Sequence, residues 1–295
     1  MTTNPSDLAR LADRGGLRPL GGRPRLVQYL VQLWQRRYFA FELARSRFRA
    51  ENEADRLGAA WIVLRPLLNA VVYGFIFGLL LASKSRPTDF VPFLVIGVFI
   101  FQYFASCFQD GAKSIINNMG LITSLHFPRA VLPIAIVIQQ LLGLVWMIGL
   151  MCILVVVFGD PILLQWWQLI PALFLLTLFN IGIACLAARL TIHLRDIAQL
   201  IPFITRIIFY LSGIFFLVDG LPGAPHWAKQ IMELNPVNIY ITLCRVALLG
   251  AKPGETVAVG YNDLNEWLFG AAWAIGVLVI GFLFFWHAED RYGRD

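Results

Sequence analysis

Arginine is the residue type in this chain with the greatest capacity for chemistry. Arg45, Arg47 and Arg49 occupy alternate positions ahead of the first long apolar stretch. A planar guanidinium group can bind two phosphate oxygens at once, so this run suits a phosphate-bearing ligand. A phosphorylated substrate and an anionic lipid headgroup both meet that description, and the sequence leaves both open.

A further arginine, Arg206, lies within an apolar stretch. A cation at hydrocarbon depth is costly and marks a functional site by default. On a helix continuous from Arg195, eleven residues earlier, it would lie about 16 Å deeper. It either faces a conduit or bonds a carbonyl or polar partner in a neighbouring helix, and both readings remain open.

Other reactive groups are sparse. The four histidines are scattered, and the four cysteines lie in apolar surroundings without C-x-x-C spacing. We therefore expect no metal site and no catalytic residue. The chain also has no G-x-x-x-x-G-K-[ST] loop, so we expect neither an ATP site nor another cofactor in it.

Long apolar stretches surround these residues, and 58% of the chain is apolar. Six stretches contain no Asp, Glu, Lys or Arg apart from Arg206 and Asp89, the first residue of the second stretch: 66–83, 89–109, 130–159, 161–188, 197–218 and 267–286. A helix needs roughly 20 residues to cross the hydrocarbon layer. The sequence therefore predicts an all-α polytopic membrane protein with six transmembrane helices.

Basic residues indicate the orientation of these spans. Eleven of the 24 Lys and Arg residues precede residue 60, and six more fall in loops or at the end on the same side, against five on the other side. The positive-inside rule then places both termini in the cytoplasm. A basic region beside apolar spans favours contact with membrane lipids over nucleic acid. Residues 1–25, rich in Arg, Gly and Pro, are predicted to form a disordered basic tail.

Residues 26–57 are predicted to form an amphipathic helix in the membrane interface. At 100° per residue, one face collects Val27, Leu30, Val31, Trp34, Tyr38, Phe41 and Phe48. Such a stripe is typical of a helix lying in the membrane plane. Arg45 and Arg49 share the aromatic face, whereas Arg47 falls opposite, which favours the first two as phosphate ligands.

The segment between the fifth and sixth spans is not a simple polar loop. Residues 234–249 are mostly apolar, begin at Asn235-Pro236 and are interrupted by Arg245. This run is too short and too polar for a full span. We expect residues 219–250 to form a pair of re-entrant outer helices that line a central cavity, since irregular backbone at that depth needs protein or water around it.

Four segments, in order, resemble the membrane subunit of an ABC type 2 exporter. The branch is the one that exports O-antigen, teichoic acid and capsular polysaccharide. The matching residues are Leu57-Gly58 with Trp61 and Pro66; Leu121-Ile122, Phe127-Pro128-Arg129 and Leu132-Pro133; Arg195-Asp196-Ile197 with Pro202 and Leu211-Ser212; and Leu234-Asn235-Pro236 with Arg245 and Leu248-Leu249-Gly250. One departure is the acidic run Glu51, Glu53 and Asp55, where the family has basic and Ser residues.

The resemblance implies that residues 58–295 form a six-span domain of the bacterial plasma membrane. It also implies partners: a second copy of the chain, two copies of a separate ATPase subunit that binds ATP and Mg²⁺, and a lipid-linked glycan as cargo. The arginine run would then meet the pyrophosphate. The basic tail and acidic elbow most resemble mycobacterial-type exporters of lipid-linked galactan.

The resemblance further assigns roles to loop and span residues. The loop 110–129 would seat in the ATPase, through Asp110, Lys113, Asn118, Leu121, Ile122 and Arg129. An ordinary connecting loop is the alternative. Conduit candidates are Tyr73, Phe101, Tyr103, Arg206 and Tyr210, because sugar rings stack on aromatic planes. Each aromatic residue could equally face lipid.

Three other functions remain to be weighed. Exporters of drugs or small hydrophobic compounds share this resemblance, so that alternative stays open. An ion-driven carrier usually shows carboxylates within its spans, and this chain has only Asp89, at the end of one stretch. A membrane glycosyltransferase needs acidic residues at an aqueous face. Asp160 and Asp196 are isolated and on opposite sides, which disfavours that class.

Overall fold

The computed structural model describes residues 25–53, 58, 60–77, 90–125, 127–158, 163–216, 225–250 and 264–289. Its helices are α2 Leu26–Gln35, α3 Arg37–Glu53, α4 Ala60–Phe75, α5 Phe90–Lys113, α6 Met119–Ser124, α7 Val131–Val157, α8 Leu169–His193, α9 Ile197–Leu211, α10 His226–Glu233, α11 Pro236–Leu249 and α12 Leu264–Trp286. Two short 3₁₀ helices, Ile116–Asn118 and Leu164–Gln168, precede α6 and α8. The described residues contain no strand, in agreement with the predicted all-α class.

Four of the described helices are long and apolar enough to cross a membrane. They are Phe90–Lys113, Val131–Val157, Leu164–His193 and Leu264–Trp286. The first predicted span corresponds to α4, which has 16 residues, and residues 78–83 of that span lie outside the described residues. Four candidate spans agree with the predicted polytopic chain, and the count of six spans stays a prediction.

The predicted fifth span is not one helix as far as residue 218. Helix α9 has 15 residues and ends at Leu211, where the chain turns at Gly213 with φ of +58°. Glycine accepts this left-handed conformation without the steric cost that other residues meet. The expectation of a continuous helix from Arg195 is also wrong, because α8 ends at His193 and α9 begins only at Ile197.

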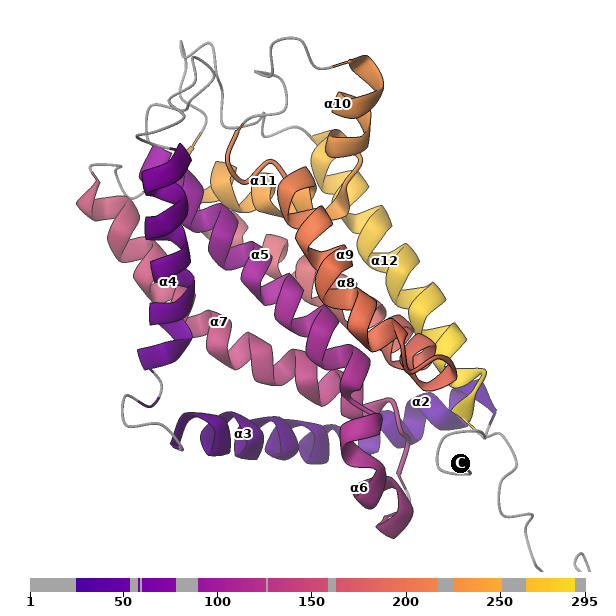
Figure 1. Cartoon of the computed structure of the whole chain (residues 1–295). Coiled ribbons are helices and arrows are strands. Elements are labelled where there is room, and N and C mark those ends of the chain that lie inside the picture. The colour runs from indigo at the N-terminus through magenta and orange to yellow at the C-terminus, as the bar shows by residue number, and fades with distance from the viewer. Residues whose placement is uncertain are drawn as a thin grey trace, which may run out of the picture.

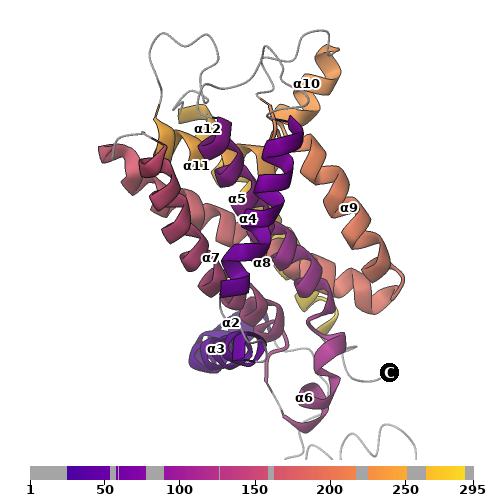
Figure 2. The same cartoon turned by 60° about the vertical axis from the view of Figure 1, so that its left-hand side comes forward.

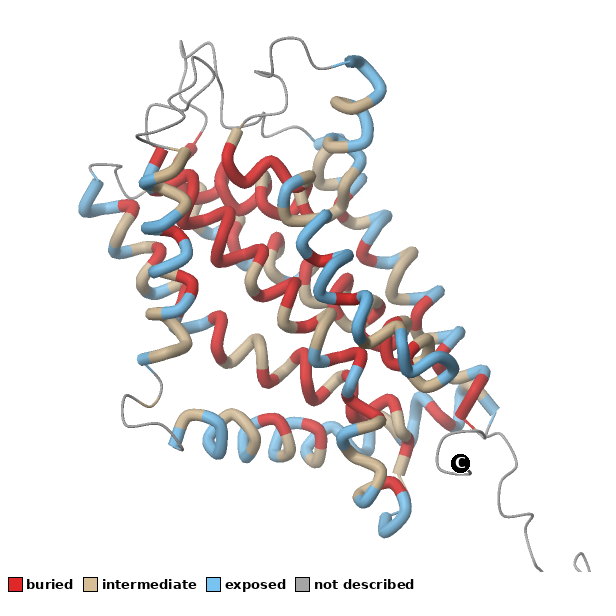
Figure 3. Tube along the Cα trace, viewed as in Figure 1, coloured by how far each residue is buried: buried red, intermediate tan, exposed pale blue. Residues whose placement is uncertain are grey.

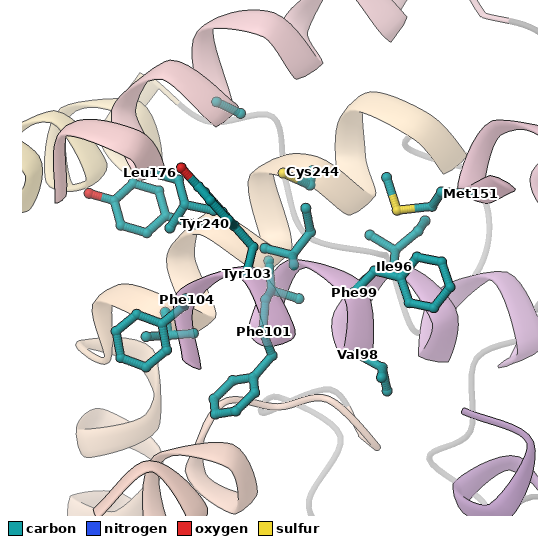
Figure 4. Packing of buried hydrophobic residues seen from close by; sticks show 14 of the residues in the cluster. Ile96, Val98, Phe99, Phe101, Tyr103, Phe104, Met151, Leu176, Tyr240 and Cys244 are labelled. Atoms are coloured by element: carbon teal, nitrogen blue, oxygen red, sulfur yellow. The ribbon is translucent and has the colours of Figure 1, made fainter. Parts of the chain in front are cut away.

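Helix α5 forms the centre of the bundle. It contacts α8, α7, α11, α4 and α9, and most of its residues are buried (Figure 3). Phe99 and Tyr103 of α5, Leu176 of α8 and Tyr240 of α11 meet in this core (Figure 4). Packing on every side explains why α5 is apolar all round.

Helices α8 and α12 approach closely through two glycines. A Cβ added to Gly281 would meet the Gly182 carbonyl oxygen at 2.1 Å, far inside van der Waals contact. Small residues at such a crossing let helix backbones touch, which is the usual device where lipid supplies no hydrophobic driving force. This contact fixes α12, and the residues after it, against α8.

Helices α2 and α3 lie across the lower ends of the long helices, with a bend at Arg36 (Figure 1). Tyr29, Ala40 and Ala44 are buried against the bundle. Most of the predicted apolar face points away from the bundle, whereas Phe48 is half-buried near Gly143 of α7. The exposed members of the face are Val27, Leu30, Val31, Trp34, Tyr38 and Phe41. This pattern fits a helix covered by lipid on its outer side, and the membrane-plane position stays a prediction. The predicted tail lies outside the described residues except for Arg25.

The upper end of the molecule carries the two short helices α10 and α11 (Figure 1). Helix α11 is buried over nearly its whole length among α5, α8 and α12. Asn235 caps it by accepting a hydrogen bond of 3.1 Å from the Val237 amide, and Pro236 fills the first helical position. These are preferred residues for a helix start. Whether this pair is re-entrant stays a prediction.

Candidate functional site

A buried polar cluster joins three distant segments at the lower end. The Tyr29 hydroxyl donates to Glu289 Oε2 at 2.8 Å and accepts from the Ala130 amide at 3.0 Å. The Arg129 amide donates to Glu289 Oε1 at 3.0 Å, and its guanidinium donates to the Glu289 carbonyl oxygen. Burial, reinforced by Glu289, raises the pKa of the Tyr29 phenol well above its usual value. The cluster ties α2, the loop before α7 and the end of α12 together.

The loop 110–129 is more helical than the sequence indicates. Asp110 and Lys113 belong to the end of α5, and α6 forms a small projecting helix (Figure 2). Ile122 is buried in a cluster with Tyr29, and Leu121 packs beside it. The predicted apolar patch thus faces the protein's own core, and the role of the loop in coupling stays a prediction.

A polar cavity of about 260 Å³ lies beside this loop, between α3, α5 and α7. Its lining consists of Arg47, Glu51, Asp110, Ser114, Asn117, Asn118, Ile136 and Gln139. Arg47 donates a hydrogen bond to Asn118 Oδ1, so the predicted interface helix is bonded directly to the loop. Partial burial lowers the pKa of the Arg47 guanidinium, and Glu51 opposes that shift.

The three arginines of the α3 run therefore have different surroundings. Arg45 and Arg49 are exposed, and Arg45 makes an ion pair of 3.9 Å with Glu42. Arg47 is half-buried and turned to the opposite side, as the helical periodicity predicts. Of the three, only Arg45 and Arg49 are exposed on the face of α3 that points away from the bundle.

Aromatic rings from three helices close one side of the molecule. Tyr73 of α4 lies 5.3 Å from Phe209 of α9 and 5.2 Å from Phe215, between ring centroids. The Phe101 ring of α5 lies 4.9 Å from the Phe209 ring. The ring of Tyr210, the next residue of α9, lies 5.5 Å from that of Phe209. Offset and edge-on pairs at these distances attract one another. We call these five rings the aromatic seam.

The seam includes three of the predicted conduit residues but not Tyr103. The Tyr103 side chain is buried on the far side of α5, where its hydroxyl donates to Thr177 Oγ1 at 3.1 Å. A tyrosine with its polar end satisfied by α8 is a core residue in this structure. Phe101 and Tyr103 are two residues apart on α5 and point to different sides of the helix. The sequence alone did not show which side packs against α8 and which against α9.

Arg206 is exposed on α9, one turn before Tyr210. Ile207 and Phe203 share its exposed surface. The single cation of the predicted fifth span thus lies at the edge of the aromatic seam, with its guanidinium accessible.

Arg245 has the opposite environment, in the core of the upper end. It is 2% exposed and donates to three backbone carbonyls, those of Phe93 at 3.2 Å, Gly213 at 2.9 Å and Ile214 at 3.0 Å. Its guanidinium carbon lies 3.4 Å from the centroid of the Phe93 ring. Arg245 therefore joins α11 to the start of α5 and to the turn after α9.

Comparison with known families gives this geometry its context. A family model described as ABC-2 type transporter matches residues 44–249, which contain the aromatic seam, Arg206 and Arg245. The chain belongs to the ABC-2 type transporter family. The predicted resemblance is thereby confirmed, and the matched region begins within α3 and ends with α11.

Permeases named for O-antigen export are similar to this ABC-2 chain over most of their length. Two O-antigen export system permease proteins RfbA of Klebsiella pneumoniae are 28% and 29% identical, covering 64% and 72% of this chain and 71% and 81% of theirs. The protein of that name from Myxococcus xanthus is 24% identical, covering 74% of this chain and 82% of its own. These relatives support membership of the polysaccharide-export branch of ABC-2 permeases.

Several residues of the site escaped the sequence analysis. Tyr29 was not among the predicted residues, and Glu289 lies 260 positions from it. Ser114 and Gln139 line the cavity without belonging to any recognisable motif. The one signal available was polarity: Gln139 and Gln140 interrupt an otherwise apolar predicted span.

Proposed function

We propose that this chain is the permease subunit of an ATP-driven exporter that moves a lipid-linked polysaccharide from the cytoplasmic to the outer side of the plasma membrane. The observation that carries the proposal is the similarity to O-antigen export permeases over 71% to 82% of their length. A family match over residues 44–249 supports the same assignment. The cargo would be a polyprenyl-pyrophosphate glycan.

The subunit would work as a homodimer with two copies of a separate ATPase subunit. ATP and Mg²⁺ would bind to those partners, in keeping with a chain that has no phosphate-binding loop. The projecting helix α6 would receive the movement of the ATPase. The cluster of Tyr29, Arg129 and Glu289 would pass it to α2 and α12 as one rigid unit, because packed elements move as bodies.

The lipid-linked head would enter between α4 and α9. The aromatic seam would close that route at rest, and its ring pairs would separate when the two helices move apart. Exposed Arg45 and Arg49 would meet the pyrophosphate first, and Arg206 at the edge of the seam would meet it next. Aromatic planes would then let sugar rings slide towards α10 and α11 without a fixed site.

A galactan is the finer assignment that we propose for the cargo. Its support is the sequence of the N-terminal region, where a basic tail and the acidic run Glu51, Glu53 and Asp55 precede the first span. The named relatives are permeases for O-antigen, so the class of glycan is better supported than its sugar.

Depletion of the protein in its native cell, followed by labelling of polyprenyl-linked glycans, tests the proposal. We expect one finished lipid-linked polymer to accumulate on the cytoplasmic side, and its sugar composition would identify the cargo. Unchanged levels of every such polymer would contradict polysaccharide export. That result would instead favour export of small hydrophobic compounds.

A further inference from the structure

The cavity between α3, α5 and α7 has no role in the mechanism proposed above. Its floor is formed by buried Ser114, Ile136 and Gln139, and its walls by half-buried Arg47 and Asn118. Glu51, Asp110 and Asn117 are exposed at its rim. At about 30 Å³ per water, its volume of about 260 Å³ would hold roughly nine waters, which is more than a bare ion requires.

Two polar atoms of the floor lack a partner. Ser114 is 1% exposed and Gln139 is 3% exposed. Within the described part of the chain, no hydrogen bond reaches Ser114 Oγ or Gln139 Oε1. A buried polar atom left unpaired destabilises the protein, so a ligand that supplies hydrogen-bond donors here would recover free energy.

The lining has an excess of acceptors. Carboxylates accept only, and of the two at the rim Asp110 already takes one donor, Gln140 Nε2 at 2.8 Å. The Arg47 guanidinium supplies the only positive charge of the lining and already donates to Asn118. A ligand with N–H donors and a positive charge fits this lining, whereas a pyrophosphate alone would face two carboxylates.

The charges of the lining also have both signs, which suits a zwitterion. A positive group would lie against the floor acceptors and the carboxylates, while a neighbouring phosphate would reach Arg47 and Asn117. The cavity is bounded by α3, the helix predicted to lie in the membrane plane. Lipid headgroups of the cytoplasmic leaflet would therefore lie at the level of the cavity.

We propose that this cavity binds the headgroup of a phospholipid that carries a primary ammonium group, of the phosphatidylethanolamine type. The ammonium supplies three N–H donors to the floor and rim acceptors, and the phosphate pairs with Arg47. The lipid would thereby fill the space between the interface helix and the loop 110–129. This site does not depend on the identity of the exported cargo.

Stepwise methylation of the headgroup nitrogen tests the proposal on the unmodified protein. The full-length chain, purified in detergent, would be mixed with phosphatidylethanolamine, its monomethyl and dimethyl forms, and phosphatidylcholine. Native mass spectrometry would measure lipid binding. Each methyl group removes a donor while the charge remains, so we expect affinity to fall in steps and to be about tenfold lower for phosphatidylcholine. Equal affinity across the series would overturn the proposal.

Substitutions locate the binding. Gln139→Leu and Ser114→Ala remove floor acceptors and should bring the affinity for phosphatidylethanolamine down to that for phosphatidylcholine. Asn180→Leu is the matched control, because Asn180 is a buried amide of α8 outside the cavity, and it should keep the preference. A preference that survives in Gln139→Leu and Ser114→Ala would overturn the assignment to this cavity.

Soluble phosphoethanolamine separates a lipid from a free ammonium compound. It carries the same headgroup without acyl chains and would be added to the lipid-depleted protein in a thermal unfolding assay. We expect a much smaller rise of Tm than with phosphatidylethanolamine at equal concentration. An equal rise would overturn the assignment to a membrane lipid.

Discussion

Two arginines in apolar surroundings, Arg206 and Arg245, have opposite environments. Arg245 is 2% exposed and donates to three backbone carbonyls from two segments. Arg206 is exposed on α9, beside the aromatic seam. Arg245 therefore holds the upper end of the bundle together, whereas Arg206 is free to act on something outside the chain. A charge in an apolar sequence can serve either stability or transport, and the backbone around it decides which.

Replacement of Arg245 should have the largest effect on stability. Arg245→Met keeps most of the volume but leaves the carbonyls of Phe93, Gly213 and Ile214 without their donor. Buried acceptors lose about 1–3 kcal/mol each when unpaired, so we expect a loss of roughly 3 kcal/mol or more. Thermal unfolding of the purified protein, followed by size-exclusion chromatography, would measure it.

Gly97→Ala should disturb the same hydrogen bonds of Arg245 without changing the arginine itself. A Cβ on Gly97 would meet Arg245 Nη2 at 2.5 Å and would displace the guanidinium. Gly276→Ala serves as the control, because a Cβ there meets nothing within 4 Å. Equal stability of the two alanine variants would contradict the importance of the Arg245 contacts.

Replacement of Tyr29 should have the second-largest effect on stability. Tyr29 is as buried as Arg245, but its side chain makes two hydrogen bonds rather than three. Tyr29→Phe removes the hydroxyl between Glu289 and the Ala130 amide and should cost about 1–3 kcal/mol. Since burial raises the pKa of Tyr29, the wild type should also lose stability as pH rises above about 10, where an unfolded tyrosine ionises. Thermal unfolding measured at several pH values should show a smaller loss of stability at high pH for Tyr29→Phe than for the wild type.

Arg206 should show the reverse pattern, with a small effect on stability and a large one on transport. Exposed substitutions usually change stability by less than about 0.5 kcal/mol. Arg206→Gln should therefore unfold like the wild type, while export in complemented cells falls. Arg36→Gln, in the exposed bend between α2 and α3, is the control and should export normally. A strongly destabilised Arg206→Gln would break the contrast with Arg245.

Replacement of Arg45 and Arg49 should have the smallest effect on stability. Both are exposed on α3, so the double variant Arg45→Gln/Arg49→Gln should assemble and unfold as the wild type does. Export should fall because the guanidinium groups that we propose to meet the pyrophosphate are lost. Labelled lipid-linked glycan in complemented cells would measure it, and unchanged export would contradict the pyrophosphate role.

The sequence predicted the class of fold and family because those depend on local patterns. Apolar length identified the long helices, and Asn235-Pro236 marked the start of α11 through ordinary capping chemistry. The amphipathic period correctly separated Arg47 from its neighbours Arg45 and Arg49. Each of these features is encoded within one or two turns of helix.

The sequence did not predict features that depend on tertiary contact. The bond between Tyr29 and Glu289 joins residues 260 positions apart. Tyr103 was grouped with Phe101 as a conduit residue, yet the two point to different sides of α5. Ile122 was expected on a docking patch and is buried. In an apolar helix, periodicity gives no sign of which face meets protein and which meets lipid or cargo.

Reconstituted transport tests the central proposal most directly. The permease and its ATPase would be placed in proteoliposomes with a labelled polyprenyl-pyrophosphate glycan, and access of the sugar to an enzyme on the far side would be measured. We predict ATP-dependent transfer that is reduced in the Arg206→Gln and Arg45→Gln/Arg49→Gln variants. Transfer of a small hydrophobic compound, with none of the lipid-linked glycan, would contradict polysaccharide export.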